Sequence, residues 1–207
     1  MAAAGRAGRA AEFLALYLCA PLAMALAMPP DWLWPVFLGV TLAALVLLAL
    51  TPGFAWRELV AGGVDWGQLA LVAVLTATAA GILVWLLVPG QALALPRRAP
   101  GFWLALMLLY PLLSALPQEL VFRALFFRRY GVLFPGGLGV AVNALGFGLA
   151  HLMFWNWVAA VLTVAGGVIF ARGYLRRGFL HAVLLHAVAG GIIFTSGLGM
   201  FFYHGAV

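Results

Sequence analysis

The residues from 102 to 130 read FWLALMLLYPLLSALPQELVFRALFFRRY, an apolar stretch with one acidic residue, Glu119, inside it. A helix needs about 20 apolar residues to cross the hydrocarbon core of a bilayer. The stretch therefore predicts a membrane-spanning helix that continues past Pro117. An ionisable side chain inside the membrane costs roughly 2.5 kcal/mol or more, which makes Glu119 a candidate functional residue.

The composition of the whole chain agrees with a membrane protein. Of its 207 residues, 67% are hydrophobic and 8% are charged, whereas a soluble domain carries about a quarter charged residues. Too few charges are present to cover a soluble surface, so we expect one integral membrane domain over residues 1–207. The single cysteine, Cys19, excludes an intramolecular disulfide.

Six more apolar runs flank residues 102–130, and together they predict an all-α, polytopic bundle of about seven transmembrane helices. The expected spans are 13–28, 32–50, 69–88, 102–130, 132–155, 157–171 and 179–196. The first run also fits a cleaved signal peptide, with residues 25–27 as the cleavage site. A retained helix is favoured because the rest of the chain is polytopic. The apolar tail up to Val207 predicts a short eighth helix, partial or re-entrant.

The arginines predict how the bundle is oriented. A cytoplasmic N-terminus would place eight arginines in cytoplasmic segments and two outside, in agreement with the positive-inside rule. The eight are Arg6, Arg9, Arg57, Arg128, Arg129, Arg172, Arg176 and Arg177, and the two are Arg97 and Arg98. The +6 charge therefore indicates membrane orientation and no nucleic-acid partner. The absence of lysine is typical of a GC-rich bacterium, so we expect the protein in a bacterial inner membrane.

Two histidines, like Glu119, are polar residues within predicted membrane spans. His151 and His186 lie in two other predicted spans. Each is costly to keep alone in lipid, so we expect all three side chains to meet in one site. Arg123 follows Glu119 by four residues and can pair with it, and Asn143 can add a hydrogen bond. Two further histidines, His181 and His204, are expected at the membrane interface.

A carboxylate and two imidazoles allow several kinds of chemistry. The carboxylate and one imidazole can deprotonate a water without metal, while the second imidazole donates to an oxyanion. Three such ligands can also bind zinc, although no His-Glu-x-x-His pattern is present. A proton-coupled transporter uses similar residues. The simplest alternative is a buried pair of Glu119 and Arg123 that only fixes helix packing.

Three short motifs resemble the CPBP family, the CAAX-prenyl-protease and bacteriocin-processing (Abi) intramembrane proteases. They are Glu119-x-x-x-Arg123, Phe147-x-x-x-His151, and His186 on a later helix. The resemblance extends over a core from about residue 102 to residue 195. It implies an intramembrane endopeptidase that cleaves near a membrane-anchored segment of a partner protein, such as a C-terminal tail or a leader. It also implies a water activated by glutamate with His151, and an oxyanion-binding role for His186.

The sequence departs from the family pattern at two positions. The family usually begins its first motif with two glutamates and assigns the first as the base, whereas this chain has Gln118 there. The family also usually has an asparagine four residues after the final histidine, where this chain has Gly190. We hypothesise that Glu119 is the base and that Gln118 or Asn143 supplies the missing donor, which requires a helix distorted near Pro117.

Two alternatives to a metal-independent protease remain open at this point. One is a catalytically degenerate member that binds membrane peptides as a scaffold. The other is a zinc-dependent variant. The partners expected in every case are the lipid bilayer and a membrane-anchored protein or peptide.

Overall fold

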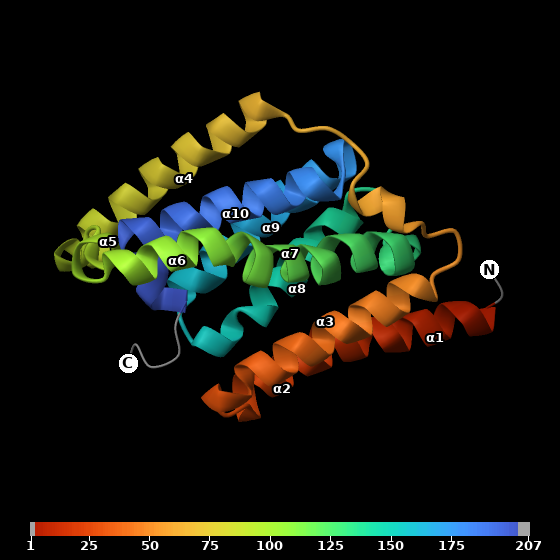
Figure 1. The fold of residues 1–207 in the computed structure, drawn as a ribbon. Helices are drawn as coiled ribbons and strands as arrows, with labels where there is room; N and C mark the ends of the chain where they lie inside the picture. The colour runs from red at the N-terminus through yellow and green to blue at the C-terminus, as the bar shows by residue number, and fades with distance from the viewer. Residues whose placement is uncertain (1–2, 203–207) are drawn as a thin grey trace.

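The computed structural model describes residues 3–202, which form helices and turns and no strands within that range (Figure 1). Three π-helical segments, with i→i+5 hydrogen bonds, interrupt the α-helices at Ala15–Cys19, Pro111–Ala115 and Leu120–Tyr130. The α-helices are α1 Ala3–Leu14, α2 Ala20–Ala27, α3 Leu33–Ala49, α4 Trp66–Leu87, α5 Ala94–Arg98, α6 Pro100–Tyr110, α7 Leu116–Glu119, α8 Leu138–Ala150, α9 Trp157–Arg177 and α10 Phe179–Ser196.

The expected all-α, polytopic bundle is confirmed. Within the described residues, five helical segments are long and apolar enough to cross a membrane: Gly5–Ala27, Trp66–Leu87, Pro100–Leu133, Trp157–Arg177 and Phe179–Ser196. Two shorter apolar helices, Leu33–Ala49 and Leu138–Phe154, correspond to the remaining two predicted spans. The protein is therefore a polytopic helical bundle, and the orientation of its ends in the membrane stays a prediction.

Several boundaries differ from the predicted ones, and the span expected over residues 157–171, for example, continues to Arg177. The span expected from residue 132 begins only at Leu138, because a turn around Gly136, with φ +60°, separates it from the preceding helix. At the other end of the chain, residues 198–202 form a short 3₁₀ helix. Residues 203–207, which include His204 and the end of the predicted eighth helix, lie outside the described part of the chain.

Helices α9 and α10 form the centre of the bundle and are joined by a single glycine. Gly178 adopts φ +97°, and a Cβ there would lie 2.7 Å from the Ala61 carbonyl oxygen, so only glycine fits this sharp turn. Helix α10 packs against α4, α9 and the π-helical segment Pro111–Ala115, and α9 also packs against α8. The resulting bundle surrounds α10 with elements from both halves of the chain (Figure 1).

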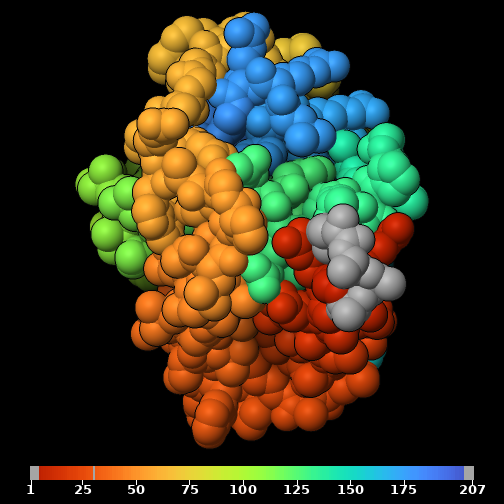
Figure 2. Space-filling model, turned by 90° about the vertical axis from the view of Figure 1, so that its right-hand side faces the viewer, coloured from red at the N-terminus to blue at the C-terminus, as the bar shows by residue number. Residues whose placement is uncertain are grey.

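The N-terminal helices cover one side of this centre. Helix α3 packs on the π-helical segment Leu120–Tyr130, and Tyr17 donates a 2.6 Å hydrogen bond from its hydroxyl to the Val121 carbonyl oxygen of that segment. The space-filling view shows residues of these helices, red and orange, gathered at one end of that face, with blue residues of α9 and α10 at the other (Figure 2). The N-terminal helices therefore cover one side of the π-helical segment that follows Glu119.

Candidate active site

Glu119 lies where the long helix changes geometry. It is the last residue of α7, a single α-helical turn between the π-helical segments Pro111–Ala115 and Leu120–Tyr130. Pro111 and Pro117 lack the backbone N–H that a regular helix uses and crowd the preceding turn, and π-helical segments are frequent at functional sites. The distortion expected near Pro117 is thus present, and it lies on both sides of Glu119.

The Glu119 side chain is completely buried, and among the described residues it is the only acidic side chain that is. Its Oε1 lies 2.9 Å from Nδ1 of His186, a residue of α10 that is 5% exposed. Hydrogen bonds that involve an ionised carboxylate are about twice as strong as neutral ones. The bond therefore fixes α7 to α10 at the centre of the bundle.

Arg123 pairs with Glu119, as the four-residue spacing predicts. Nε of Arg123 lies 3.2 Å from Oε2 of Glu119, and both side chains are completely buried. The guanidinium makes no hydrogen bond within residues 3–202, but its Cζ lies 4.8 Å from the centre of the Phe147 ring and 5.7 Å from that of Phe170. The arginine is thus held by one carboxylate and two aromatic faces.

His151 lies beside this pair but hydrogen-bonds elsewhere. It ends α8, and its Nδ1 lies 2.8 Å from the Phe147 carbonyl oxygen one turn earlier. The Phe147 ring lies 4.6 Å from the His151 ring and 5.5 Å from the His186 ring, centre to centre. Phe147 thus separates and orients the two imidazoles. The structure places the three predicted residues in one neighbourhood, with the direct bond between Glu119 and His186 and not between Glu119 and His151.

The two residues proposed as substitute donors are engaged in other bonds. The Gln118 side-chain amide donates to the Ser114 hydroxyl at 2.9 Å, one turn back on the same helix. The Asn143 amide donates to the Phe122 carbonyl oxygen and is completely buried. Asn143 thereby ties α8 to the π-helical segment Leu120–Tyr130. Its role is therefore structural, because it holds the segment next to Glu119 in place.

One residue of the site was missed at the level of sequence. Tyr110, the last residue of α6, lies with its ring centre 6.0 Å from that of His186. An α-helix advances about 100° per residue, so Tyr110 and Glu119, which are nine positions apart, are predicted on opposite helix faces. The intervening π-helical segment changes that rotation. The one hint in the sequence is Gly190. It has no side chain, which leaves room for the Tyr110 ring.

His181 differs from its expected place. It lies in the first turn of α10, near the helix end, but it is completely buried and not exposed at the interface. Its Nε2 lies 3.0 Å from Oε1 of Gln68 in the first turn of α4. His181 therefore joins α10 to α4, because a buried imidazole needs a polar partner.

No metal-binding cluster is present in the described part of the chain. Within residues 3–202, no three His, Cys, Asp or Glu side chains lie close enough together to hold a metal ion. His151 and His186 share the Phe147 ring as a neighbour, but with Glu119 they do not converge in the manner of a zinc site, where four tetrahedral bonds of about 2 Å are needed.

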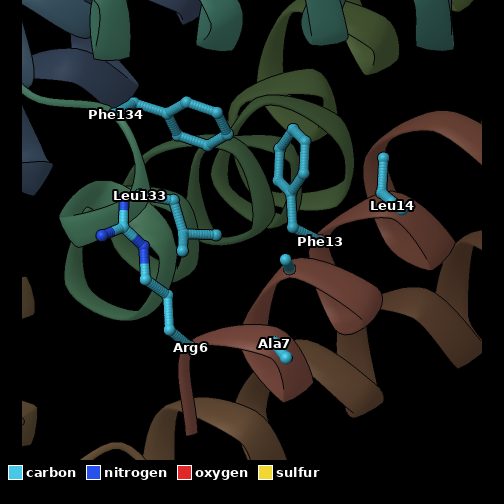
Figure 3. A pocket seen from close by; sticks show the side chains of 7 residues that line it. Arg6, Ala7, Phe13, Leu14, Leu133 and Phe134 are labelled. Carbon is cyan, nitrogen blue, oxygen red and sulfur yellow. The ribbon is translucent and has the colours of Figure 1, made fainter. Parts of the chain in front are cut away.

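Two surface hollows lie away from Glu119. One has a volume of about 500 Å³ and is lined by α1 and residues 133–134 (Figure 3). In Figure 3 the rings of Phe13 and Phe134 form one wall, and Arg6 lies at the rim. The other, about 580 Å³, lies near the turn between α9 and α10, beside Arg128, Arg176 and Arg177. Neither hollow is lined by Glu119, His151 or His186.

Comparison with known proteins agrees with the motifs. Residues 100–192 match the family model described as Type II CAAX prenyl endopeptidase Rce1-like. No curated protein and no solved structure matches the chain. The matched range contains Glu119, Arg123, Phe147, His151 and His186. The chain is therefore a multi-pass membrane protein whose residues 100–192 are similar to the type II CAAX prenyl endopeptidase Rce1-like family.

Proposed function

We propose that the protein is an intramembrane endopeptidase that hydrolyses a peptide bond near a membrane-anchored segment of another protein. The observation that carries this proposal is the buried hydrogen bond between Glu119 and His186, 2.9 Å long, inside an Rce1-like domain. A carboxylate bonded to an imidazole, in a site with little water, is an arrangement suited to taking a proton from a nucleophile.

The hydrogen bonds support a definite division of roles. With Glu119 ionised, its oxygen can only accept, so His186 Nδ1 carries the proton and its Nε2 keeps a lone pair. The Phe147 carbonyl likewise requires the proton on Nδ1 of His151. Both imidazoles then present a proton-accepting Nε2. This differs from the oxyanion-binding role that the family resemblance implies for His186.

Hydrolysis by these residues needs only water as a co-reactant. As the water oxygen forms a bond to the carbonyl carbon, His186 Nε2 takes a water proton, and His151 Nε2 accepts a hydrogen bond from the other. Glu119 stabilises the imidazolium, as the aspartate does in a serine protease. When the tetrahedral intermediate collapses, the carbon–nitrogen bond breaks, and the same proton passes from His186 to the leaving amine.

The substrate class follows from where the site lies. Glu119 is buried among membrane-spanning helices, so the bond to be cut has to lie close to a segment that the bilayer holds. Prenylated C-terminal peptides, apolar C-terminal tails and leader peptides are the three forms we propose. We also propose that the protein acts in the inner membrane of a bacterium, with the lipid bilayer itself as a required partner.

The test uses the purified full chain in lipid nanodiscs. One reporter peptide of each form, labelled on both sides of a central segment, is incubated with the protein and its products are identified by mass spectrometry. We expect the wild-type protein to cleave one of them and Glu119→Gln to lose at least about 10³-fold in kcat. Glu58→Gln, which alters an exposed carboxylate, serves as the matched control. Equal cleavage by Glu119→Gln and wild type would refute the assignment.

The same reporters distinguish the scaffold alternative, which the presence of Gln118 favours. If the chain is a degenerate member, the wild-type protein binds a reporter without cutting it, and Gln118→Glu gains cleavage from none. If it is a protease, the wild-type protein already cleaves. A zinc-dependent variant would contain about one zinc per chain by elemental analysis and would lose activity to a chelator. We expect cleavage that withstands the chelator.

A further inference from the structure

The Tyr110 hydroxyl occupies the place of a missing side chain on α10. A Cβ built on Gly190 would overlap with the hydroxyl oxygen, Cζ and Cε1 of Tyr110. Gly190 follows His186 by four residues, so both lie on one face of α10. The tyrosine therefore reaches across from the end of α6 and ends one helical turn beyond the imidazole that is bonded to Glu119.

The hydroxyl is a free donor in the immediate surroundings of the site. The Tyr110 ring lies 6.0 Å from that of His186 and 5.3 Å from that of Phe194, and the tyrosine is within electrostatic range of the Glu119 carboxylate. Within residues 3–202 the hydroxyl makes no hydrogen bond, whereas that of Tyr17 does. Tyr110 is only partly buried, so its free hydroxyl beside a proposed base can reach a ligand, and an amphipathic tyrosine at such a place typically hydrogen-bonds to one.

The other neutral polar side chains of the site have their donors engaged, whereas the Arg123 guanidinium makes no hydrogen bond within residues 3–202 and lies against Glu119 and the rings of Phe147 and Phe170. The protons on Nδ1 of His186 and Nδ1 of His151 are used by Glu119 and by the Phe147 carbonyl. The Gln118 amide donates to Ser114 and the Asn143 amide to Phe122. Hydrolysis of a peptide bond nevertheless places a negative charge on the carbonyl oxygen, and that charge needs a positioned donor. Tyr110 is the neutral donor left among these side chains for that task, because the cationic Arg123 is held beside the Glu119 carboxylate.

We infer that Tyr110 is a catalytic residue that donates a hydrogen bond from its hydroxyl to the oxyanion of the tetrahedral intermediate. The inference rests on the proposed peptide hydrolysis. As the water oxygen bonds to the carbonyl carbon, the electron pair of the C=O double bond moves onto the carbonyl oxygen. The tyrosine donates a hydrogen bond to that oxygen and keeps its proton. When the carbon–nitrogen bond breaks, the electron pair returns and the hydroxyl is released unchanged.

Tyr110→Phe removes this donor and keeps the ring that packs against Gly190. Removal of one oxyanion donor typically lowers kcat by about 10²–10³-fold, so we expect that loss with KM changed less than about threefold. Tyr174→Phe is the matched control, because Tyr174 stacks on Phe127 far from Glu119. Retention of the wild-type kcat in Tyr110→Phe would overturn the inference. Equal thermal unfolding of both variants in detergent excludes misfolding as the cause of a loss.

A second pair of variants moves the hydroxyl without altering the tyrosine. Gly190→Ala introduces a methyl group where the hydroxyl lies, whereas a Cβ on the neighbouring Gly191 would meet only Met107 Sδ at 3.4 Å. We expect Gly190→Ala to lower kcat by about tenfold or more and Gly191→Ala to leave it within about twofold. Moreover, adding Gly190→Ala to Tyr110→Phe should cause no further loss, because the donor is already absent. Independent, multiplying losses would contradict the inference.

Failure of this inference and failure of the proposed function give different results. If Glu119→Gln is inactive while Tyr110→Phe cleaves like the wild type, the protease assignment stands and Tyr110 is only a packing residue. If Glu119→Gln cleaves like the wild type, or the wild type cleaves no reporter, the proposed function falls and the role of Tyr110 falls with it. A loss in both variants, with intact Tyr174→Phe, supports both.

Discussion

The central and peripheral spans of this bundle use the same apolar residue types but differ in how much of each is buried inside the protein. In their most apolar windows, 44% of the residues of Phe179–Ser196 and 39% of those of Trp157–Arg177 are buried, against 17% for both Gly5–Ala27 and Trp66–Leu87. The buried charged side chains, Glu119 and Arg123, face the central helices. The peripheral spans offer mostly lipid-facing surface. Position in the bundle, more than composition, therefore decides what a span can do.

Among the tests of this comparison, we expect the largest loss of stability from breaking the buried ion pair between Glu119 and Arg123. Arg123→Met leaves the Glu119 carboxylate buried without its cation, which typically costs about 3–5 kcal/mol. Arg128→Met breaks an exposed pair, with Glu58, in which the side chains are 37% and 35% exposed, and such pairs contribute about 0–1 kcal/mol. Equilibrium unfolding in mixed detergent micelles measures both. Similar losses of unfolding free energy in the two variants would show that burial does not determine how much each ion pair contributes.

A second test compares glycines on a central and a peripheral helix. A Cβ on Gly167 of α9 would lie 2.8 Å from Ala144 Cα of α8, whereas one on Gly81 of α4 would meet nothing within 4 Å. We expect Gly167→Ala to destabilise the protein by about 1–3 kcal/mol through overpacking, since small residues let membrane helices approach closely. Gly81→Ala should stabilise it by about 0.5–1 kcal/mol. The same unfolding assay shows whether each variant is stabilised or destabilised. A change in the same direction for both would contradict the difference between central and peripheral helices.

The smallest effect concerns how the N-terminal span is attached to the centre. Tyr17→Phe removes the hydrogen bond to the Val121 carbonyl oxygen and leaves a buried acceptor, for about 0.5–1.5 kcal/mol. Tyr174→Phe removes a hydroxyl without a hydrogen bond in the described part of the chain and should change stability by less than about 0.5 kcal/mol. Hydrogen exchange of residues 120–130 should rise in the first variant and stay unchanged in the second.

Much of the fold was accessible from the sequence because membrane insertion is read from local composition. The apolar runs predicted the five span-length helical segments and the two shorter apolar helices, and Pro117 marked where the long helix is distorted. The site residues were accessible for a related reason. Buried polar residues are so costly in lipid that Glu119, His151 and His186 stood out without any structure.

The pairing within the site was not accessible in that way. The family resemblance implied that Glu119 works with His151, but the direct hydrogen bond is to His186. His151 bonds to the carbonyl of Phe147 on its own helix, which no spacing of polar residues reveals. His181 was expected at the interface and is completely buried, because the packing of α10 on α4 covers it.

The sequence alone determined that the chain is a helical membrane bundle, that Glu119 lies inside it, and that Arg123 can reach the carboxylate. These follow from hydrophobicity and helix periodicity, which act over a few residues of one segment. Only the tertiary structure decided that His186 bonds to Glu119 and that the Tyr110 hydroxyl fills the space at Gly190. Contacts between helices depend on their rotation, and the π-helical segments around Glu119 change that rotation in a way that local periodicity does not predict.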